Sequence, residues 1–287
     1  MRRDGIRYRN EKPMYQVAAY IMNKRVDSMN MITLDIPQDP MVEYVHRKRD
    51  EGVLLSRLAV VMAAYVRVLA EFPKLNHFVV NSKLYARKEI SVGMVVLKGS
   101  MTDGGTMSKI YLLPTDTIFE VQKKLTEYIE ANRREDPKNG TEKMIKILLS
   151  VPGLVRGAVA LFRWMDKHGL LPKKLIDMSP FHISLLLTDL ASIRTDSIYH
   201  HVYEFGTTSI AAAMGNSREV PKRKGGEIIF QKCMPIGFVM DERIADGSYF
   251  AIAFRRFQDY MKHPEKLEQP PEVIDEEIRK IFKIEEK

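Results

Sequence analysis

Histidine and cysteine side chains are the groups in this chain most ready for proton transfer or nucleophilic attack. His200 and His201 stand side by side, and an imidazole with a pKa of about 6.5 suits a general base near neutral pH. The same pair is also typical of a loop in which both rings bond to backbone carbonyls. The seven histidines show no spacing typical of metal ligands, so we expect no metal site.

Cys233 is the single cysteine of the chain and a second candidate, as a nucleophile that carries an acyl group. It precedes an apolar run, where a lone cysteine is more often a small core residue. A chain with one cysteine forms no internal disulfide, which suits a reducing compartment. We therefore expect a cytoplasmic location.

A charged loop near the C-terminus stands between two strongly patterned segments. The apolar run from Met234 to Met240 reads as a strand, and residues 241–247 read as a loop. Asp246 then opens a helix that is closed by Pro264. Glu242 lies in this loop, directly after the strand.

Composition places the chain among ordinary globular proteins. It has 287 residues, 45% of them hydrophobic and 29% charged, with a net charge of +8. The N-terminus lacks the apolar core of a signal peptide, and no run of about 18 apolar residues predicts a membrane span. The positive charge suits a nucleic acid, a phosphorylated cofactor or an anionic lipid, and a solvated surface rich in lysine is the favoured interpretation. Without zinc-finger spacing, a glycine-rich phosphate loop or an aromatic-interleaved basic motif, we expect no nucleic-acid partner.

Hydrophobic periodicity and turn residues predict one α/β domain, residues 1–265, built in two layers with a mixed β-sheet. Thr117 and Glu120 form a capping box at the start of one helix. Helices are expected at residues 15–25, 39–48, 54–72, 117–132, 143–171 and 246–263. Strands are expected at residues 31–36, 77–80, 83–86, 90–97, 108–113, 181–188, 209–214 and 227–240. The acidic tail, residues 266–287, is expected to be loosely held.

Five landmarks occur along the chain in the order found in one known superfamily. They are the step 72–76 (FPKLN), the paired strands 92–97 and 107–113, the strand end 188–193 (TDLASI), the strand 211–215 and the loop 241–247. This order resembles the catalytic domain of the chloramphenicol acetyltransferase and dihydrolipoamide acyltransferase superfamily. The loop resembles the H-x-x-x-D-G signature of that superfamily, with Glu242 in the place of the histidine.

The resemblance implies an acyl-transfer reaction with coenzyme A or acyl-CoA as a substrate, at a site between the subunits of a homotrimer. It implies that Glu242 occupies the position of the general base and that Thr188 hydrogen-bonds the oxyanion. Asp246 would shape the loop by pairing with an N-terminal arginine, either Arg7 or Arg9. No lipoyl domain is expected in this chain, and the layout is closer to the free-standing antibiotic acetyltransferases.

Glu242 changes the chemistry that the signature supports. A solvated glutamate has a pKa about two units below that of histidine, which makes it a weaker base by about 3 kcal/mol. Burial in a channel raises such a pKa, whereas an ionised carboxylate repels the oxyanion and the phosphates of coenzyme A. His201, reaching into the channel, is the alternative base.

The apolar segment at residues 143–171 departs from the superfamily pattern. We expect it to pack on its own domain or on a trimer neighbour, with Trp164 as a packing residue. A lid over a greasy substrate is the second interpretation. Contact with a membrane surface, helped by Arg156 and Arg163, is the third and least favoured.

Two functions from different classes fit these residues. The first is a coenzyme A-dependent acyltransferase that acts on a small-molecule or lipid-like acceptor through a hydroxyl, thiol or amine. Its catalytic residues would be Glu242, Thr188, Asp246 and His201. The second is a catalytically inactive trimer, a binding or scaffold homologue of the dihydrolipoamide acyltransferase core.

Overall fold

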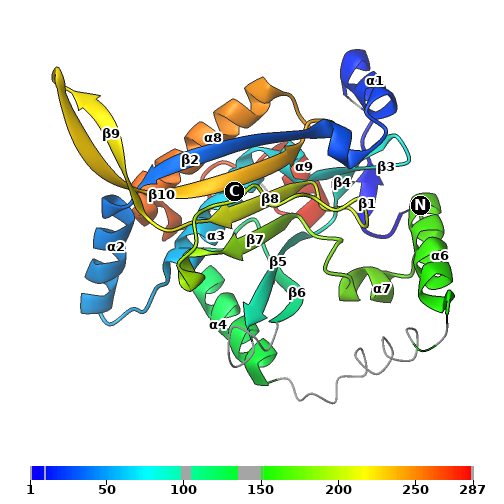
Figure 1. Ribbon diagram of the computed structural model, residues 1–287, viewed down its shortest axis with the longest axis horizontal. Coiled ribbons are helices and arrows are strands. Elements are labelled where there is room, and N and C mark those ends of the chain that lie inside the picture. The colour runs from blue at the N-terminus through cyan, green and yellow to red at the C-terminus, as the bar shows by residue number, and fades with distance from the viewer. Residues whose placement is uncertain (1, 10, 98–104, 135–149, 151, 286–287) are drawn as a thin grey trace.

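The computed structural model describes residues 2–9, 11–97, 105–134, 150 and 152–285. The strands are β1 (Gly5–Arg7), β2 (Met29–Pro37), β3 (His77–Val80), β4 (Lys83–Arg87), β5 (Ile90–Leu97), β6 (Gly105–Leu112), β7 (Leu185–Asp189), β8 (Ile210–Met214), β9 (Arg218–Lys224) and β10 (Glu227–Asp241). The helices are α1 (Pro13–Ile21), α2 (Asp39–Asp50), α3 (Arg57–Glu71), α4 (Ile118–Arg134), α6 (Leu154–His168), α7 (Lys173–Met178), α8 (Gly247–Lys262) and α9 (Glu276–Phe282). Figure 1 shows their arrangement.

A mixed sheet forms the centre of the molecule, in the order β2-β10-β8-β7-β5-β6. β10 runs antiparallel to both β2 and β8, whereas β8, β7 and β5 run parallel to one another. β9 forms a hairpin with the first half of β10, and this hairpin projects beyond the sheet (Figure 1). The mixed sheet expected from the sequence is confirmed.

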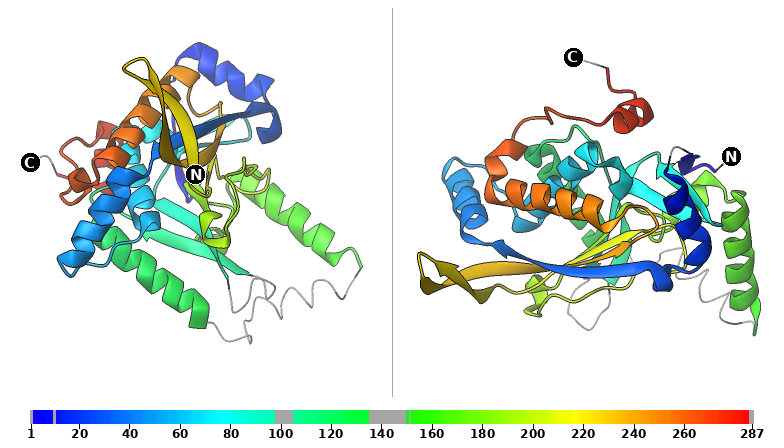
Figure 2. Two further views of the ribbon diagram at one scale, coloured as in Figure 1. Left: turned by 60° about the vertical axis from the view of Figure 1, so that its left-hand side comes forward. Right: turned by 90° about the horizontal axis from the view of Figure 1, so that it is seen from above.

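Helices cover one face of the sheet and form the second layer (Figure 2). Within this layer α3 is buried along almost its whole length, α8 contacts it, and α8 buries Phe250, Phe254 and Phe257. These side chains join alternate residues of β10, such as Phe238, in the main apolar core. Alternation along a strand directs one set of side chains to the helices and the other to the opposite face.

A small sheet, in the order β1-β4-β3, stands beside the main sheet. α6 is tied to the start of β1, because Arg2 donates hydrogen bonds to the Asp166 carboxylate at 2.7 Å and to the Asp166 carbonyl at 2.6 Å. The first part of the expected helical segment, residues 143–149, lies outside the described residues. Trp164 on α6 is exposed, so it is not packed within its own domain, and packing on a trimer neighbour stays a prediction. Among the described helices, none has the length and apolarity to cross a bilayer.

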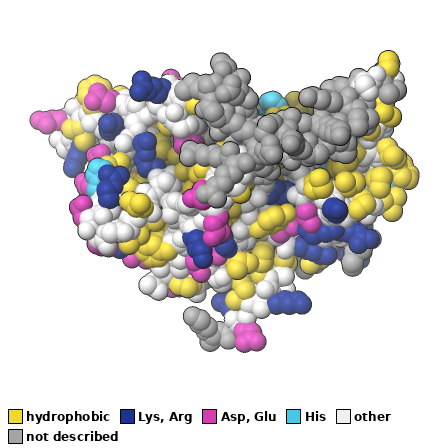
Figure 3. Space-filling view, turned by 90° about the horizontal axis from the view of Figure 1, so that it is seen from below, with side chains coloured by type: hydrophobic (Ala, Val, Ile, Leu, Met, Phe, Trp, Pro, Cys, Tyr) yellow, Lys and Arg dark blue, Asp and Glu magenta, His cyan; other side chains and the backbone are white. Residues whose placement is uncertain are grey.

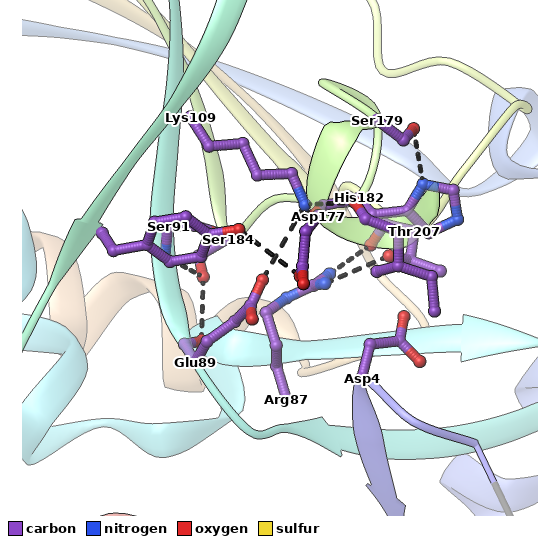
Figure 4. Close-up of polar contacts among 12 residues, drawn as sticks. Asp4, Arg87, Glu89, Ser91, Lys109, Asp177, Ser179, His182, Ser184 and Thr207 are labelled. Carbon is purple, nitrogen blue, oxygen red and sulfur yellow. Dashed lines mark hydrogen bonds and ion pairs between the residues drawn. The ribbon is translucent and has the colours of Figure 1, made fainter. Parts of the chain in front are cut away.

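A buried polar network fixes the segment that leads into β7 (Figure 4). Lys109 on β6 donates hydrogen bonds to the carbonyls of Ile176 and His182, both at 2.7 Å, and lies 3.8 Å from Glu89. Burial lowers the pKa of Lys109 to about 8, and the charge of Glu89 offsets part of that effect. The network therefore anchors both sides of the turn that precedes β7.

The C-terminal segment is part of the core, so the expectation of a loosely held tail is wrong. Leu267 and Ile278 are buried in the main cluster. The amide of Asp275 donates to the carbonyl of Ala70 at 2.9 Å, and Glu277 contacts the His77 imidazole at 2.6 Å. Apolar residues are too few among the acidic residues of this segment for their spacing to predict that it packs in the core.

Ile278→Ala is expected to lower the free energy of unfolding by about 2–5 kcal/mol, because the change empties a packed site in the core. The matched control is Ile228→Ala, which alters an exposed side chain on the β9–β10 hairpin and should cost little. Urea unfolding followed by circular dichroism measures both. Equal stabilities for the two variants would contradict the placement of α9.

Candidate active site

The loop after β10 begins α8 through a capping aspartate. The Asp246 carboxylate accepts hydrogen bonds from the Tyr249 amide at 2.7 Å and the Ser248 hydroxyl at 2.6 Å. Its other oxygen accepts the Tyr15 hydroxyl at 2.7 Å. Hydrogen bonds from Ser248, Tyr249 and Tyr15, in that order, lower the pKa of Asp246 to about 2.

Tyr15 on α1, rather than an arginine, is the N-terminal partner of Asp246. The expected pairing with Arg7 or Arg9 is wrong, because the Asp246 carboxylate is bonded to Tyr15, Ser248 and Tyr249 and to no arginine among the described residues. An aspartate that needs only hydrogen-bond donors is satisfied by a tyrosine, a backbone amide and a serine. The sequence offered no signal that distinguishes these donors from an arginine.

Asp241 is the ion-pairing aspartate of this loop, and the sequence analysis missed it. Its fully buried carboxylate accepts hydrogen bonds from Arg243 Nε at 2.8 Å and Nη2 at 2.7 Å, and from Ser28 Oγ at 3.0 Å. Arg25 Nε lies 3.4 Å from the second carboxylate oxygen. An N-terminal arginine therefore does contact the loop, but at Asp241 instead of Asp246.

The two arginines connect the Asp241 cluster to neighbouring segments. Arg25 also donates to the Tyr203 carbonyl and, through its backbone amide, to the Glu204 carboxylate. Arg243 Nη1 donates to the carbonyl of Met22 at 3.1 Å. The cluster thus joins the segment before β2, the segment before β8 and the end of β10.

Glu242 is held by its backbone and leaves its side chain in solvent. Its amide donates to the carbonyl of Ser28 at 2.8 Å, which extends the β2–β10 pairing by one bond. The side chain is exposed, and it forms no hydrogen bond or ion pair with another described residue. Asp241 and Arg243, the buried residues on either side, fix the point on the surface from which the Glu242 side chain extends into solvent.

Thr188 lies half-buried near the C-terminal end of β7. Leu186, two residues earlier, packs in the small apolar cluster on the face opposite the helices, so Thr188 shares that face. Ala213 on β8 and Gly237 on β10 stand beside it in register. Next to Thr188, burial raises the pKa of Asp189, with an N–H bond from Ser192 acting against the rise.

Glu242 and Thr188 are far apart within one chain. β10 is antiparallel to β7, so the C-terminal ends of these two strands lie at opposite ends of the sheet along the strand direction (Figure 1). Glu242 is five residues beyond Gly237, which is level with Thr188 two strands away. At about 3.3 Å per residue and 4.8 Å per strand, the two backbones are roughly 19 Å apart.

The segment between β7 and β8 crosses the outer face from one candidate residue toward the other. Level with Thr188, a Cβ added to Gly237 would stand 2.4 Å from the Ile198 carbonyl oxygen, so glycine is needed for this close approach. Tyr199 then bonds through its hydroxyl to Thr33 Oγ1 at 2.7 Å. At the far end, Tyr203 and Glu204 reach Arg25 beside the Asp241 cluster.

His200 and His201 therefore lie between the level of Thr188 and the end of β10. His200 Nδ1 is 2.9 Å from the His201 carbonyl, and the two rings stack with centroids 5.2 Å apart. His201 is exposed, and its ring meets Tyr203 edge-on. Cys233, by contrast, is fully buried in β10, as its core interpretation expects. No group of three His, Cys, Asp or Glu side chains in the described ranges is placed to hold a metal ion.

Solved acyltransferase structures share this architecture. A probable dihydrolipoamide acetyltransferase from Listeria monocytogenes matches with a TM-score of 0.56 at 14% identity, over 93% of this chain and 99% of that one. The dihydrolipoamide acetyltransferase of Azotobacter vinelandii matches with a TM-score of 0.57 at 14% identity, over 91% and 94%. A chloramphenicol acetyltransferase matches with a TM-score of 0.54 at 12% identity, over 90% and 100%.

No protein-family model and no curated protein matches the sequence, so the likeness is one of structure. The matches span nearly the full length of both partners. This chain has the fold of the dihydrolipoamide and chloramphenicol acetyltransferase catalytic domains. The resemblance and the fold class expected from the five landmarks are confirmed.

Asp241→Ala is expected to lower the free energy of unfolding by about 3–5 kcal/mol, because it leaves two buried arginines without their carboxylate. The control is Asp35→Ala, which breaks a partly exposed pair with Arg218 at 3.0 Å and should cost about 0–1 kcal/mol. Chemical unfolding of both variants measures the difference. A loss no greater than that of the control would contradict the proposed importance of the cluster.

The dependence of stability on acid pH tests the ionised state of the Asp241 carboxylate. Burial alone would raise the pKa of Asp241, but hydrogen bonds and charge from Arg243, with the charge of Arg25, hold it below its ordinary value. The contribution of Asp241 to the free energy of unfolding is therefore present above the unfolded pKa of about 4 and is lost as pH falls through the folded pKa. The wild-type chain should lose more stability than Asp241→Ala between about pH 5 and about pH 2. Parallel curves would contradict this.

Proposed function

We propose that the protein is a coenzyme A-dependent acyltransferase whose active site forms between two copies of the chain. Glu242 would come from one copy and Thr188 from its neighbour in a homotrimer. The observation that carries this proposal is the placement of the two residues at opposite ends of one sheet. A head-to-tail contact brings unlike ends together, and repeating it closes a ring.

The reaction is the transfer of an acyl group from a thioester to a small-molecule or lipid-like acceptor. Glu242 would take the proton of the acceptor hydroxyl, thiol or amine, which attacks the thioester carbonyl carbon. Thr188 would donate its hydroxyl proton in a hydrogen bond to the oxyanion of the tetrahedral intermediate. The carbon–sulfur bond then breaks, and the coenzyme A thiolate takes the proton from Glu242.

Asp246 and His201 would support this step from either side of Glu242. Asp246 positions the loop by capping α8 and by its bond to Tyr15. His201 is exposed on the segment that approaches the end of β10, where it can take the place of Glu242 as the base.

The spacing of these residues supports the assignment. In the Azotobacter vinelandii enzyme a serine, a histidine and an asparagine are named in the catalytic mechanism, and they stand 52 and 4 positions apart in that order. Thr188, Glu242 and Asp246 stand 54 and 4 positions apart. Thr188 keeps the hydroxyl of the serine, Asp246 has a carboxylate in place of the asparagine amide, and Glu242 changes the base itself.

Coenzyme A has a basic hollow available near Thr188. A hollow of about 480 Å³ is lined by His46, Arg49 and Arg57 together with polar and apolar residues of α2 and the start of α3. The charge of Arg57 acts on Asp189, so this hollow lies beside the Thr188 end of the sheet. Cationic side chains there suit the phosphates of coenzyme A. The single, buried cysteine suits the reducing cytoplasm as the location.

A mixed oligomer tests the split site directly. Thr188→Ala and Glu242→Gln are each expected to reduce thioester turnover by about 100-fold or more, because each removes a group that acts in the transition state. Coexpressed in equal amounts, the two variants should regain about a quarter of wild-type activity, since one interface in four then carries both intact residues. Coenzyme A release measured with a thiol reagent reports the rate. Mixed oligomers no more active than the single variants would contradict a shared site.

The second candidate is an inactive trimer with a binding or scaffold role, and the exposed carboxylate of Glu242 favours it. Restoring the imidazole separates the two functions. For the enzyme, Glu242→His should raise turnover about tenfold or more at neutral pH, because the stronger base is restored. Calorimetry should show coenzyme A binding by the wild-type chain and by the Glu242→Gln and Glu242→His variants. If none of the three proteins binds coenzyme A or turns over a thioester, the scaffold function is the one that remains.

A further inference from the structure

Helix α6 exposes an apolar strip that the described residues of its own domain leave in solvent. Phe162 stacks on Phe205, and Asp166 pairs with Arg2, so these residues define the packed side of the helix. Leu154, Leu161 and Trp164 are 41%, 57% and 53% exposed. At about 100° per residue, these three fall within an arc of about 80° on a different side of the helix.

A cationic stripe runs along the same helix next to the strip. Arg156, Arg163 and Lys167 share an arc of about 40°, by the same helical spacing. All three are exposed, and none forms an ion pair with a carboxylate in the part of the chain that the structure describes. Their charges are therefore available to an outside partner, and Trp164 lies between this stripe and the apolar strip's other members.

A basic hollow adjoins the C-terminal end of α6. Its volume is about 360 Å³, and its cationic lining consists of Arg2, Arg7, Arg9, Lys83 and Lys167, with His168 beside them. Arg2 is committed to Asp4 and Asp166, whereas the other four have no carboxylate partner among the described residues. No described residue of the lining is acidic. Figure 3 shows hydrophobic side chains along the right-hand edge, where α6 lies, with Lys and Arg gathered beside them.

We propose that this end of the molecule binds the surface of an anionic lipid bilayer. Leu154, Leu161 and Trp164 would enter the boundary between headgroups and acyl chains, and the basic hollow would take a lipid phosphate. An apolar strip bordered by Arg and Lys, with tryptophan at the border, matches the layering of that boundary. A second copy related by a two-fold axis is a poorer partner for the same face, because it would bring the same cations toward these.

Trp164 reports on the proposed contact directly, because it is the only tryptophan in the chain. The full-length protein is titrated with vesicles of equimolar phosphatidylcholine and phosphatidylglycerol, and with vesicles of phosphatidylcholine alone. The anionic vesicles should shift Trp164 emission to shorter wavelength and sediment with the protein, and high salt should reverse both effects. The neutral vesicles should do neither.

Two variants and one control separate this surface from the general positive charge of the chain. Leu161→Asp and Lys83→Glu should each weaken binding to anionic vesicles by about tenfold or more. Lys262→Glu makes the same charge change at the far end of α8 and should leave binding unchanged. Circular dichroism confirms that each variant is folded.

Several results would overturn the proposal, whether or not the protein transfers acyl groups. Trp164 emission that is unmoved by anionic vesicles would do so, as would an equal loss of binding in Lys262→Glu. A change of oligomeric state in Leu161→Asp, seen by gel filtration, would assign the strip to a contact between copies. Binding of inorganic pyrophosphate without binding of vesicles would make the hollow a site for a soluble anion.

Discussion

The direction of β10 is the constraint on which the candidate site depends. Because β10 returns antiparallel to β8 and β7, the loop that carries Glu242 emerges at the side of the sheet opposite Thr188. Side-chain movement cannot close a gap of roughly 19 Å between backbones. Any chemistry that needs both residues therefore needs two copies of the chain. Each copy presents Glu242 at one end of its sheet and Thr188 at the other end.

Burial of charge fixes the exposed end of that arrangement. Asp241 is surrounded by two arginines and a serine hydroxyl, and its neighbour Glu242 is left without a side-chain partner in the described residues. A buried carboxylate is tolerated only when donors satisfy it, and such a cluster allows little variation in geometry. The ion cluster thus places an unpaired carboxylate at a defined point of the surface, while Asp246 determines where α8 begins.

Local patterns predicted most of the fold, because periodicity, proline positions and caps are written in neighbouring residues. The capping box at Thr117 and the cap at Asp246 both formed as expected. Partners distant in sequence were harder: Arg25 with Asp241 and Tyr15 with Asp246 are each separated by more than 200 positions, and several arginines were equivalent by spacing alone. Exposure of Trp164 could not be read from helical spacing, because an amphipathic helix with two apolar sides gives the same pattern as a buried one.

The most direct measurement of the central claim is an experimental structure of the assembled protein with coenzyme A. The account predicts a cyclic trimer in which the Glu242 carboxylate of one protomer and the Thr188 hydroxyl of the next line a single cleft that holds the thiol. A monomer, or an assembly in which solvent-facing surfaces separate these two groups, would contradict it.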